Sequence, residues 1–218
     1  MSVVPLRRLT AASTIAADLR EALLSGVFAP GTPLIADDLA GRTGAPTATV
    51  RAALSELERD GLVVHSLHRG VEVARITSDE LRDIYAARQV YEVAGLRAML
   101  RQRPVDVSWL HAAVERMGEA AIAANERALV EGDMAFHLAI VAAAGSRRLT
   151  RAAQGALMEL RLVLSVADRA ADDMPAQVAD HQHLAEVFER GRARESVAAL
   201  EDHLARGEVQ ARAAASVL

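Results

Sequence analysis

The apolar positions between residues 35 and 74 change from a helical to a strand-like period. Two stretches carry apolar residues on one helical face and are separated by Gly44, as a tight turn between crossing helices requires. Two short apolar runs then flank a polar turn that ends in a glycine, which is typical of a hairpin. In chain order, the pattern predicts a helix around Leu39 and Ala40, a helix over residues 47–60, and strands over residues 62–64 and 71–73.

Helical periodicity also describes the rest of the chain. A first helix, with Ser13 as its expected N-cap, ends at Gly26. After residue 77 the pattern becomes a series of long alanine-rich helices, separated by proline, glycine and asparagine. We expect these helices over residues 78–101, 106–124, 126–144, 147–170, 175–190 and 193–214. The predicted fold is mainly α, with a winged helix-turn-helix and its small β-hairpin over residues 1–75, a linker over 76–77 and an all-α helical bundle over 78–218.

A helix-turn-helix followed by a wing is a DNA-binding arrangement, in which the second helix enters the major groove. The exposed start of that helix and the basic turn of the hairpin would face the DNA. Residues 1–75 contain eight arginines and eight acidic residues, so this module has no net charge and attracts phosphates weakly. We therefore expect a homodimer that binds a palindromic double-stranded DNA operator. The residues expected to contact DNA are Arg42, Thr47, Ala48, Thr49, Arg51, His68, Arg69 and Gly70.

The composition of the chain limits the fold classes and the cellular locations that fit it. The 218-residue chain is 51% hydrophobic but only 3% aromatic, which favours packed helices over sheets. It has no cysteine, which excludes disulfides and thiolate metal sites, and all 25 basic residues are arginine. No apolar run approaches the roughly 20 residues that span a bilayer, and the N-terminus lacks the apolar core of a secretory signal. We expect a cytoplasmic protein with no membrane partner, and with Trp109, Leu110 and Met117 in its core.

Four residues of the C-terminal helices are of types that commonly bind metals. Asp133 and His137 are four residues apart and share a helix face, while His181 and His203 lie on two later helices. Three imidazoles and a carboxylate suit zinc, nickel or another borderline divalent cation. The aspartate-to-histidine spacing is a weak motif, and the alternative is that these are scattered residues with ordinary hydrogen bonds. His183 is two residues from His181, so it should point to another side of its helix.

Longer strings of the sequence resemble a known family. The strings LREALLSGVFAPGTPL, LAGRTGAPTATVRAALSELERDGLV and HRGVEVA are similar to the winged helix of GntR-type transcription regulators. The strings DIYAARQVYE, DMAFHLAIVAAAGS, DHQHLAEVF and ALEDHL resemble the all-helical effector domain of the FadR branch, which is called the FCD domain. Six helices match the shorter, VanR-like form of that domain. The strings keep the order and spacing of the family, and together they cover nearly the whole chain.

This resemblance implies a ligand-responsive transcription regulator, which is not an enzyme. It also implies a divalent metal inside the helical bundle, zinc or nickel among others, with positions left open for a small carboxylate metabolite. The ligands, for one ion per chain, would be Asp133, His137, His181 and His203. Arg88 matches an arginine that faces this pocket in the family, and its planar fork suits a carboxylate. The alternative for Arg88 is an ion pair with Glu92 on the helix surface.

The second helix of the DNA-binding module departs from the family pattern. Thr47 stands where an arginine commonly reads DNA, and Pro46 replaces a serine cap, whereas Arg51 keeps the second arginine. Proline is well placed at a helix start, so the fold inference is unaffected. Losing one bidentate arginine removes a preference of about 1–3 kcal/mol for guanine at one position. The operator sequence therefore does not carry over from the family.

Two other functions stay open at this point. One is an all-helical metal-dependent hydrolase fused to a nucleic-acid-binding module. Hydrolysis needs a positioned base beside an open coordination site, and no spare carboxylate lies at a motif-like spacing. The other is an architectural DNA-binding protein whose helical domain serves only for dimerisation. Ligand-dependent release of DNA, turnover without DNA, and DNA binding that ignores metals and metabolites would distinguish the three functions.

Overall fold

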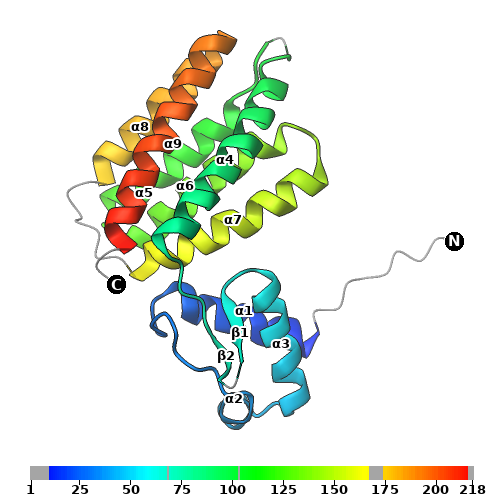
Figure 1. Cartoon of the computed structure of the whole chain (residues 1–218). Coiled ribbons are helices and arrows are strands. Elements are labelled where there is room, and N and C mark those ends of the chain that lie inside the picture. Colours follow the sequence, from blue (N-terminus) through cyan, green and yellow to red (C-terminus); the bar gives the residue numbers. More distant parts are fainter. Residues whose placement is uncertain (1–9, 68, 103, 167–173, 216–218) are drawn as a thin grey trace, which may run out of the picture. The chain divides into compact units, whose positions relative to one another are not determined.

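The chain forms two compact units, Met1–Arg75 and Ile76–Leu218. The computed structural model describes residues 10–67, 69–102, 104–166 and 174–215. Figure 1 shows the helices of both units and the hairpin of the first unit. Within the described ranges, no helix is both long enough and apolar enough to cross a membrane.

The first unit is a winged helix-turn-helix, which confirms the fold class expected for the N-terminal part. Strands β1 and β2 form an antiparallel hairpin in which Val63 pairs with Val73 and Ser66 with Gly70. Apolar side chains of the three helices and the hairpin, such as Leu57, are fully buried against one another. The elements are α1 (Ala11–Leu24), α2 (Ala36–Thr43), α3 (Thr47–Arg59), β1 (Val63–Ser66) and β2 (Gly70–Val73).

Two helix ends of this unit show how the local sequence sets its elements. The backbone N–H of Ser13 donates to Thr10 Oγ1 at 3.1 Å, so Thr10 is the N-cap of α1 and the expectation for Ser13 was wrong. The Ser13 hydroxyl instead donates to Glu56 on α3 at 3.2 Å. Helix α2 ends at Gly44, whose φ of 67° lies in the left-handed region that glycine adopts without a Cβ clash. This turn sets the crossing of α2 and α3.

The second unit is all-helical in its described residues, as expected. Its helices are α4 (Ser78–Met99), α5 (Ser108–Ile122), α6 (Glu126–Ala142), α7 (Arg147–Val166), α8 (Met174–Glu189) and α9 (Ala193–Ala215). Helix α4 begins with a capping box, in which Thr77 and Glu80 each accept a hydrogen bond from the other's backbone N–H.

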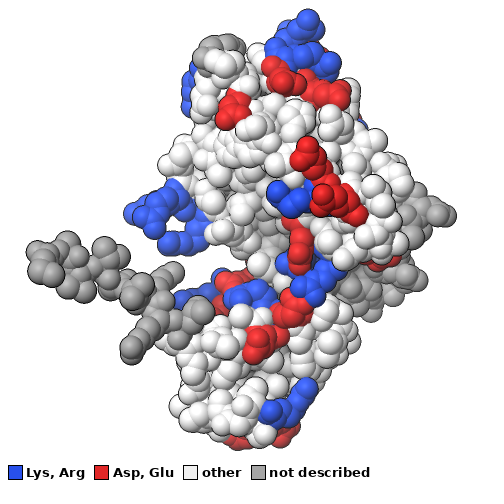
Figure 2. All heavy atoms as spheres, turned by 180° about the vertical axis from the view of Figure 1, so that it is seen from behind, with Lys and Arg blue, Asp and Glu red and all other residues white. Residues whose placement is uncertain are grey.

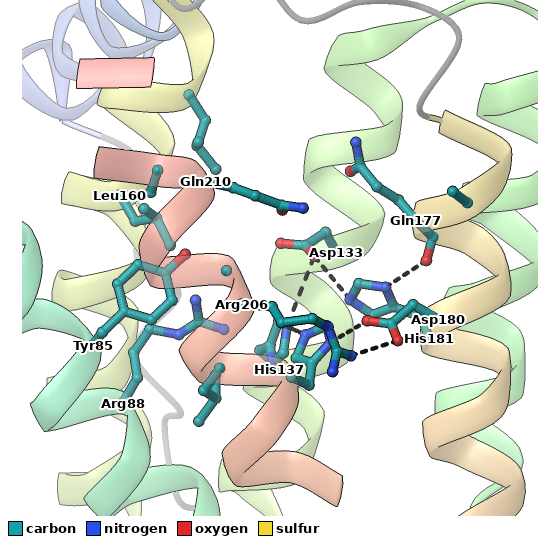
Figure 3. Close-up of a pocket in the computed structure, with 16 residues that line it drawn as sticks. Tyr85, Arg88, Asp133, His137, Leu160, Gln177, Asp180, His181, Arg206 and Gln210 are labelled. Carbon is teal, nitrogen blue, oxygen red and sulfur yellow. Dashed lines mark hydrogen bonds and ion pairs between the residues drawn. The ribbon is translucent and has the colours of Figure 1, made fainter. Parts of the chain in front are cut away.

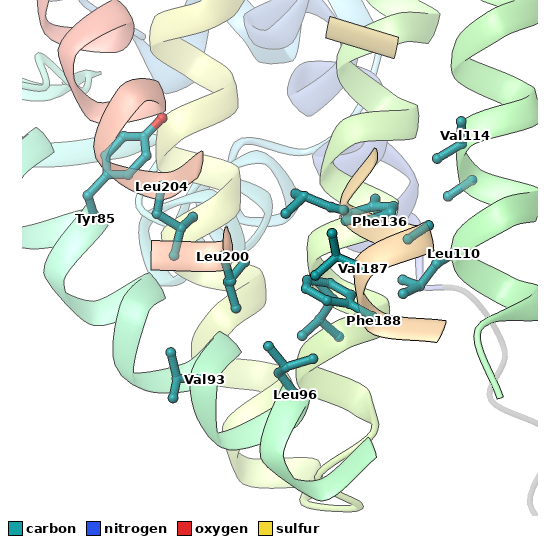
Figure 4. Close-up of a cluster of buried hydrophobic side chains, with 14 of the residues drawn as sticks. Tyr85, Val93, Leu96, Leu110, Val114, Phe136, Val187, Phe188, Leu200 and Leu204 are labelled. Carbon is teal, nitrogen blue, oxygen red and sulfur yellow. The ribbon is translucent and has the colours of Figure 1, made fainter. Parts of the chain in front are cut away.

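A large apolar cluster fills the centre of the second unit, and a smaller one lies around Met117 and Leu129. The large cluster draws side chains from helices that include α4, α5, α6, α8 and α9, and Phe136 and Phe188 at its centre are fully buried (Figure 4). Helices α4 and α6 touch through their backbones, because a Cβ on Gly95 would lie 2.1 Å from the carbonyl oxygen of Ile140. This close approach places the polar face of α4 directly against α6, where the metal-binding residue types lie.

The core expectation fails for one of its three residues. Leu110 and Met117 are fully buried, but Trp109 is 36% exposed. Its indole N–H donates to the carbonyl oxygen of Asp106 at 2.9 Å, which holds the ring across the start of α5. An aromatic residue at a helix start can satisfy its polar atom locally, so it does not need a place in the core.

Candidate metal and ligand site

Three histidines from three helices meet inside the second unit. They are His137 on α6, His181 on α8 and His203 on α9, called here the histidine cluster, and their ring nitrogens include atoms that all lie within 4.8 Å of one another (Figure 3). All three residues are buried. Asp133 lies one turn before His137, with Oδ1 2.9 Å from Nε2 of His181 and 3.7 Å from Nε2 of His137. The structure thus brings together the four residues whose types bind metals.

Each ring of the histidine cluster has a hydrogen-bond acceptor behind its Nδ1 atom. Because each of these partners is an acceptor, Nδ1 carries a proton in every ring, and the Nε2 atoms are left to face one another. The Nε2 atoms of His137 and His203 are 3.2 Å apart. The acceptors are the Glu92 carboxylate at 2.7 Å from His137, the Gln177 carbonyl at 2.8 Å from His181, and the Asp180 carboxylate at 2.6 Å from His203.

The spacing of these atoms fits a shared cation. Nε2 of His181 is buried and, among the described residues, forms no hydrogen bond, because its close approach to Asp133 lacks hydrogen-bond geometry. Ligand atoms about 2.1 Å from one ion, at angles of about 90–109°, would be about 3.0–3.4 Å apart. The three separations given above, 2.9, 3.2 and 3.7 Å, surround that range. The donor set therefore suits a divalent metal with room for further ligands.

The charges of the site favour ionised carboxylates and one neutral ring. Burial by itself would raise the pKa of Asp133, but His181 and His137 hold it well below its usual range. Burial lowers the pKa of His137 to about 4, although Glu92 acts in the opposite direction. For His181, burial lowers the pKa less than Asp133 raises it, so the pKa of this ring is raised. These shifts describe the protein without metal.

Arg88 forms the ion pair with Glu92 that was the alternative to a role in the pocket, but the pair is not on the surface. Arg88 Nε donates to Glu92 Oε1 at 2.9 Å, and the two residues are 3% and 1% exposed. The surface alternative is wrong because the contact of Gly95 with α6 buries this face of α4. Arg88 Nη2 is buried without a hydrogen-bond partner in the described chain, and the guanidinium lies 4.9 Å from the ring centre of Tyr85. Arg88 thus keeps donor capacity toward the adjoining cavity.

That cavity has a volume of about 240 Å³ and adjoins the histidine cluster. Arg88 and Asp133 line it together with the three imidazoles, and Figure 3 shows the side chains of Arg88 and Gln210 reaching toward the cluster. Several polar residues of this site carry no signal in the sequence that would have marked them. These are Tyr85, Gln177, Asp180, Arg206 and Gln210 in the cavity wall, and Glu92 as the support of His137.

Two other histidines of the second unit lie outside the cluster. His183 is exposed, as its position two residues after His181 predicts. His111 lies 3.8 Å from the carboxylate of Glu189, with a third of its side chain exposed. Both residues are therefore suitable controls for experiments on the cluster.

In the first unit, the residues expected to contact DNA fall into two groups. Arg51, Arg69 and Gly70 line one groove of about 470 Å³ between α3 and the hairpin. Arg42 and Ala48 are exposed but do not line this groove. Thr47 and Thr49 are half-buried, and the Thr47 hydroxyl donates to Asp37 at 2.9 Å. His68 lies outside the described residues.

The acidic residues at the far end of α3 have partners within the unit. Glu58 lies 3.3 Å from His65, and Asp60 accepts a hydrogen bond from Arg20. Both acidic residues lie at the opposite end of α3 from its start at Thr47. Acidic and basic side chains are interspersed on the face of the molecule in Figure 2.

Both units of the chain match known protein families. Residues 11–73 match the gntR family of bacterial regulatory proteins, and residues 83–206 match the FCD domain. A probable D-xylose utilization operon transcriptional repressor of Paenarthrobacter nicotinovorans is 25% identical over an alignment of 205 residues, which covers 91% of this chain and 89% of that protein.

Solved structures are similar over nearly the whole chain. A GntR transcriptional regulator from Rhodococcus sp. RHA1 has a TM-score of 0.83 and 27% identity, over 93% of this chain and 98% of that one. McbR/YncC of E. coli shares the fold, with a TM-score of 0.78 and 16% identity over 94% of this chain and 98% of its own. The matched families and relatives are transcription regulators and not enzymes, which argues against the hydrolase alternative. The chain therefore belongs to the GntR family of transcription regulators, with an FCD domain after its winged helix-turn-helix.

Proposed function

We propose that the FCD unit of this regulator binds one divalent metal ion per chain and, beside the metal, a small carboxylate metabolite as effector. The proposed ligands are Asp133, His137, His181 and His203. The observation that carries the proposal is the hydrogen bonding of the three imidazoles, whose Nδ1 atoms each donate to a separate acceptor while their Nε2 atoms face one another. Such acceptors behind the ring are the usual support of metal-bound histidine.

The chemistry of the donor set limits the choice of metal. Three neutral nitrogens and one carboxylate oxygen favour zinc, nickel or another borderline cation over magnesium and calcium. Bound there, the ion would supply a Lewis-acidic centre with open positions for an oxygen ligand. The pKa of His181 is raised in the metal-free protein, so protons compete with a metal for this ring more strongly than for an ordinary histidine. Metal binding requires the neutral ring, so metal affinity should fall as the pH falls.

Arg88 is the proposed binding partner of the effector carboxylate. Its Nη2 is buried without a hydrogen-bond partner in the described chain, which leaves a donor that a carboxylate in the cavity could satisfy. Its other side is held by Glu92 at 2.9 Å. The pair would therefore present the guanidinium in a fixed orientation.

For the first unit we propose binding to a palindromic operator by two copies of the chain. The winged helix carries no net charge in residues 1–75, so a single copy would gain little from phosphate contacts. In this proposal the helical unit forms the dimer contact. The effector would then act by shifting the equilibrium between two arrangements of the dimer, to the extent that it binds one of them more tightly.

The metal proposal is tested by elemental analysis of the purified protein and of two matched variants. We expect close to one divalent ion per chain, loss of the ion in His203→Ala, and retention in His183→Ala. Chelation should lower the melting temperature of the parent protein, because a ligand that binds only the folded state stabilises it. Equal metal content in both variants, or a chelator without effect on melting, would contradict the assignment.

A further inference from the structure

The buried charges of the site nearly cancel, and this balance limits the charge of an effector that could bind there. Arg88 and Glu92 form a buried pair of opposite charge. Asp133 adds one negative charge, and metal-bound imidazoles are neutral. Asp180 and Arg206 form a second pair at the outer edge, where their side chains are 35% and 49% exposed. With a divalent ion bound, the buried site therefore has an excess of one positive charge.

An excess charge inside a protein is unfavourable unless an opposite charge joins it. One carboxylate would make the metal-loaded site neutral. A second carboxylate on the same molecule would restore an unpaired charge in the cavity, because Arg206, the other cation in the described cavity wall, already bonds Asp180 at 2.8 Å. Without the metal, the site lacks this excess positive charge and has no open metal position for the carboxylate.

The remaining polar side chains of the cavity wall are uncharged. Tyr85 and Gln177 lie along the wall, and Gln210 lies at its exposed edge on α9. Phenol and amide groups both donate and accept hydrogen bonds, so they complement hydroxyl groups. The cavity volume of about 240 Å³ equals the share of about eight water molecules in the liquid. A short acid of three to five carbons is of this size.

We propose that the effector is a short hydroxylated monocarboxylate, and that the cavity discriminates against dicarboxylates of the same length. Its single carboxylate binds between the metal and Arg88, and its hydroxyl groups face Tyr85, Gln177 and Gln210. This inference rests on the proposed function of the same site, because the charge balance requires the metal.

The test is calorimetric titration of the zinc-loaded full-length protein with four-carbon acids of graded chemistry. The probes are butyrate, 2-hydroxybutyrate, 2,3,4-trihydroxybutyrate and malate. Malate differs from 2-hydroxybutyrate by a carboxylate in place of a methyl group, so this pair isolates the second charge. We expect the trihydroxy acid to bind most tightly and malate to bind about tenfold or more weakly than 2-hydroxybutyrate.

The outcomes separate this inference from the function on which it rests. Malate that binds as tightly as 2-hydroxybutyrate, or butyrate that binds as tightly as the trihydroxy acid, overturns the inference and leaves carboxylate sensing intact. Failure of all four acids to bind, or equal binding without metal, overturns both. The chelated protein should bind none of the four.

A charge introduced at the cavity edge gives a second test. Gln210→Arg should reverse the preference, because the added cation pairs with the second carboxylate of malate. The matched control is Val209→Arg, which adds the same charge at the neighbouring position of α9, 67% exposed and outside the cavity wall. The control should keep the parent's preference. A reversal in both variants, or in neither, would contradict the assignment of Gln210 to the effector site.

Discussion

The three imidazoles of the histidine cluster are held in surroundings of different polarity. His137 is 1% exposed and rests on Glu92, which is itself buried beside Arg88. The Asp180 carboxylate behind His203 is instead 35% exposed and also binds Arg206. The proton equilibrium of His137 is therefore controlled by burial, whereas the support of His203 remains in contact with solvent.

The burial of His137 predicts a pH dependence for the metal-free protein. Its pKa is lowered to about 4 in the folded state, against about 6.5 in an unfolded chain. As the pH falls from 6.5 toward 4, the unfolded chain takes up a proton that the folded protein does not, so the free energy of unfolding decreases. His181 has a raised pKa, and its stabilising contribution stays fully present over this window.

Thermal melts of the chelated protein between pH 6.5 and 4.5 measure this effect. We expect the melting temperature to fall through the window, and to fall less steeply in His137→Gln, which has no titrating ring. A melting temperature that is constant or rises with falling pH would show that the ring is not held in its neutral form.

Helix α4 links the packing of the second unit to its candidate site. It carries Arg88 and Glu92 one to two turns before Gly95, where its backbone meets that of α6. Any change that separates α4 from α6 would also move Glu92 away from His137. The glycine therefore has a part in the geometry of the histidine cluster, although it is not a ligand.

Gly95→Ala should destabilise the protein by about 1–3 kcal/mol or more, because the new methyl group would lie 2.1 Å from the Ile140 carbonyl oxygen. The control is Gly118→Ala on α5, where the new methyl group would have no atom of another element within 4 Å. This variant should gain about 0.5–1 kcal/mol in its free energy of unfolding. Denaturant unfolding measures both values. We also expect weaker metal binding in Gly95→Ala alone. Equal stability of the two variants would exclude the close contact of α4 with α6.

Helix α3 and the hairpin supply two arginines with different expected roles. Arg51→Ala should weaken binding to the specific operator by about 1–3 kcal/mol, because a base contact is lost. Arg69→Ala should weaken binding to all sequences and reduce the salt dependence by about one phosphate contact. Both side chains are exposed beside one groove, so the fold should be unaffected. If both variants give the same DNA footprint as the parent protein, α3 and the hairpin do not form the recognition surface.

At the scale of the whole molecule, the balanced charge of the DNA-binding unit predicts a dimer. Light scattering should give twice the chain mass of 23.2 kDa at micromolar concentration. The salt dependence of operator binding should then correspond to the phosphate contacts of two winged helices. A monomer that still binds one palindrome tightly would contradict this prediction.

The sequence was sufficient for the elements but only partly for the site. Glycines such as Gly44 end helices by a local conformational preference, so the helix ends could be read directly. Thr10 and Ser13 are both good N-caps, and the sequence pattern alone did not distinguish them. Trp109 was placed in the core because its side chain is apolar, but its N–H finds a partner at the helix start.

The candidate ligands could be grouped before the structure was known only through their likeness to a family. Asp133 and His137 share a helix turn, but His203 is 66 residues from His137, and nothing local requires their contact. The acceptors behind the rings were missed for the same reason. Glu92 reaches His137 across 45 residues, only because α4 and α6 pack closely at Gly95.

The position of Trp109 at the start of α5 has a practical consequence. It is the only tryptophan in the chain, and it belongs to the second unit. Its fluorescence therefore reports on the helical unit alone, whereas circular dichroism follows the helices of both units. Melts recorded by the two methods would coincide if the units unfold together and would separate if each unfolds independently. The native protein thus contains a label for one of its two units, and no probe has to be attached.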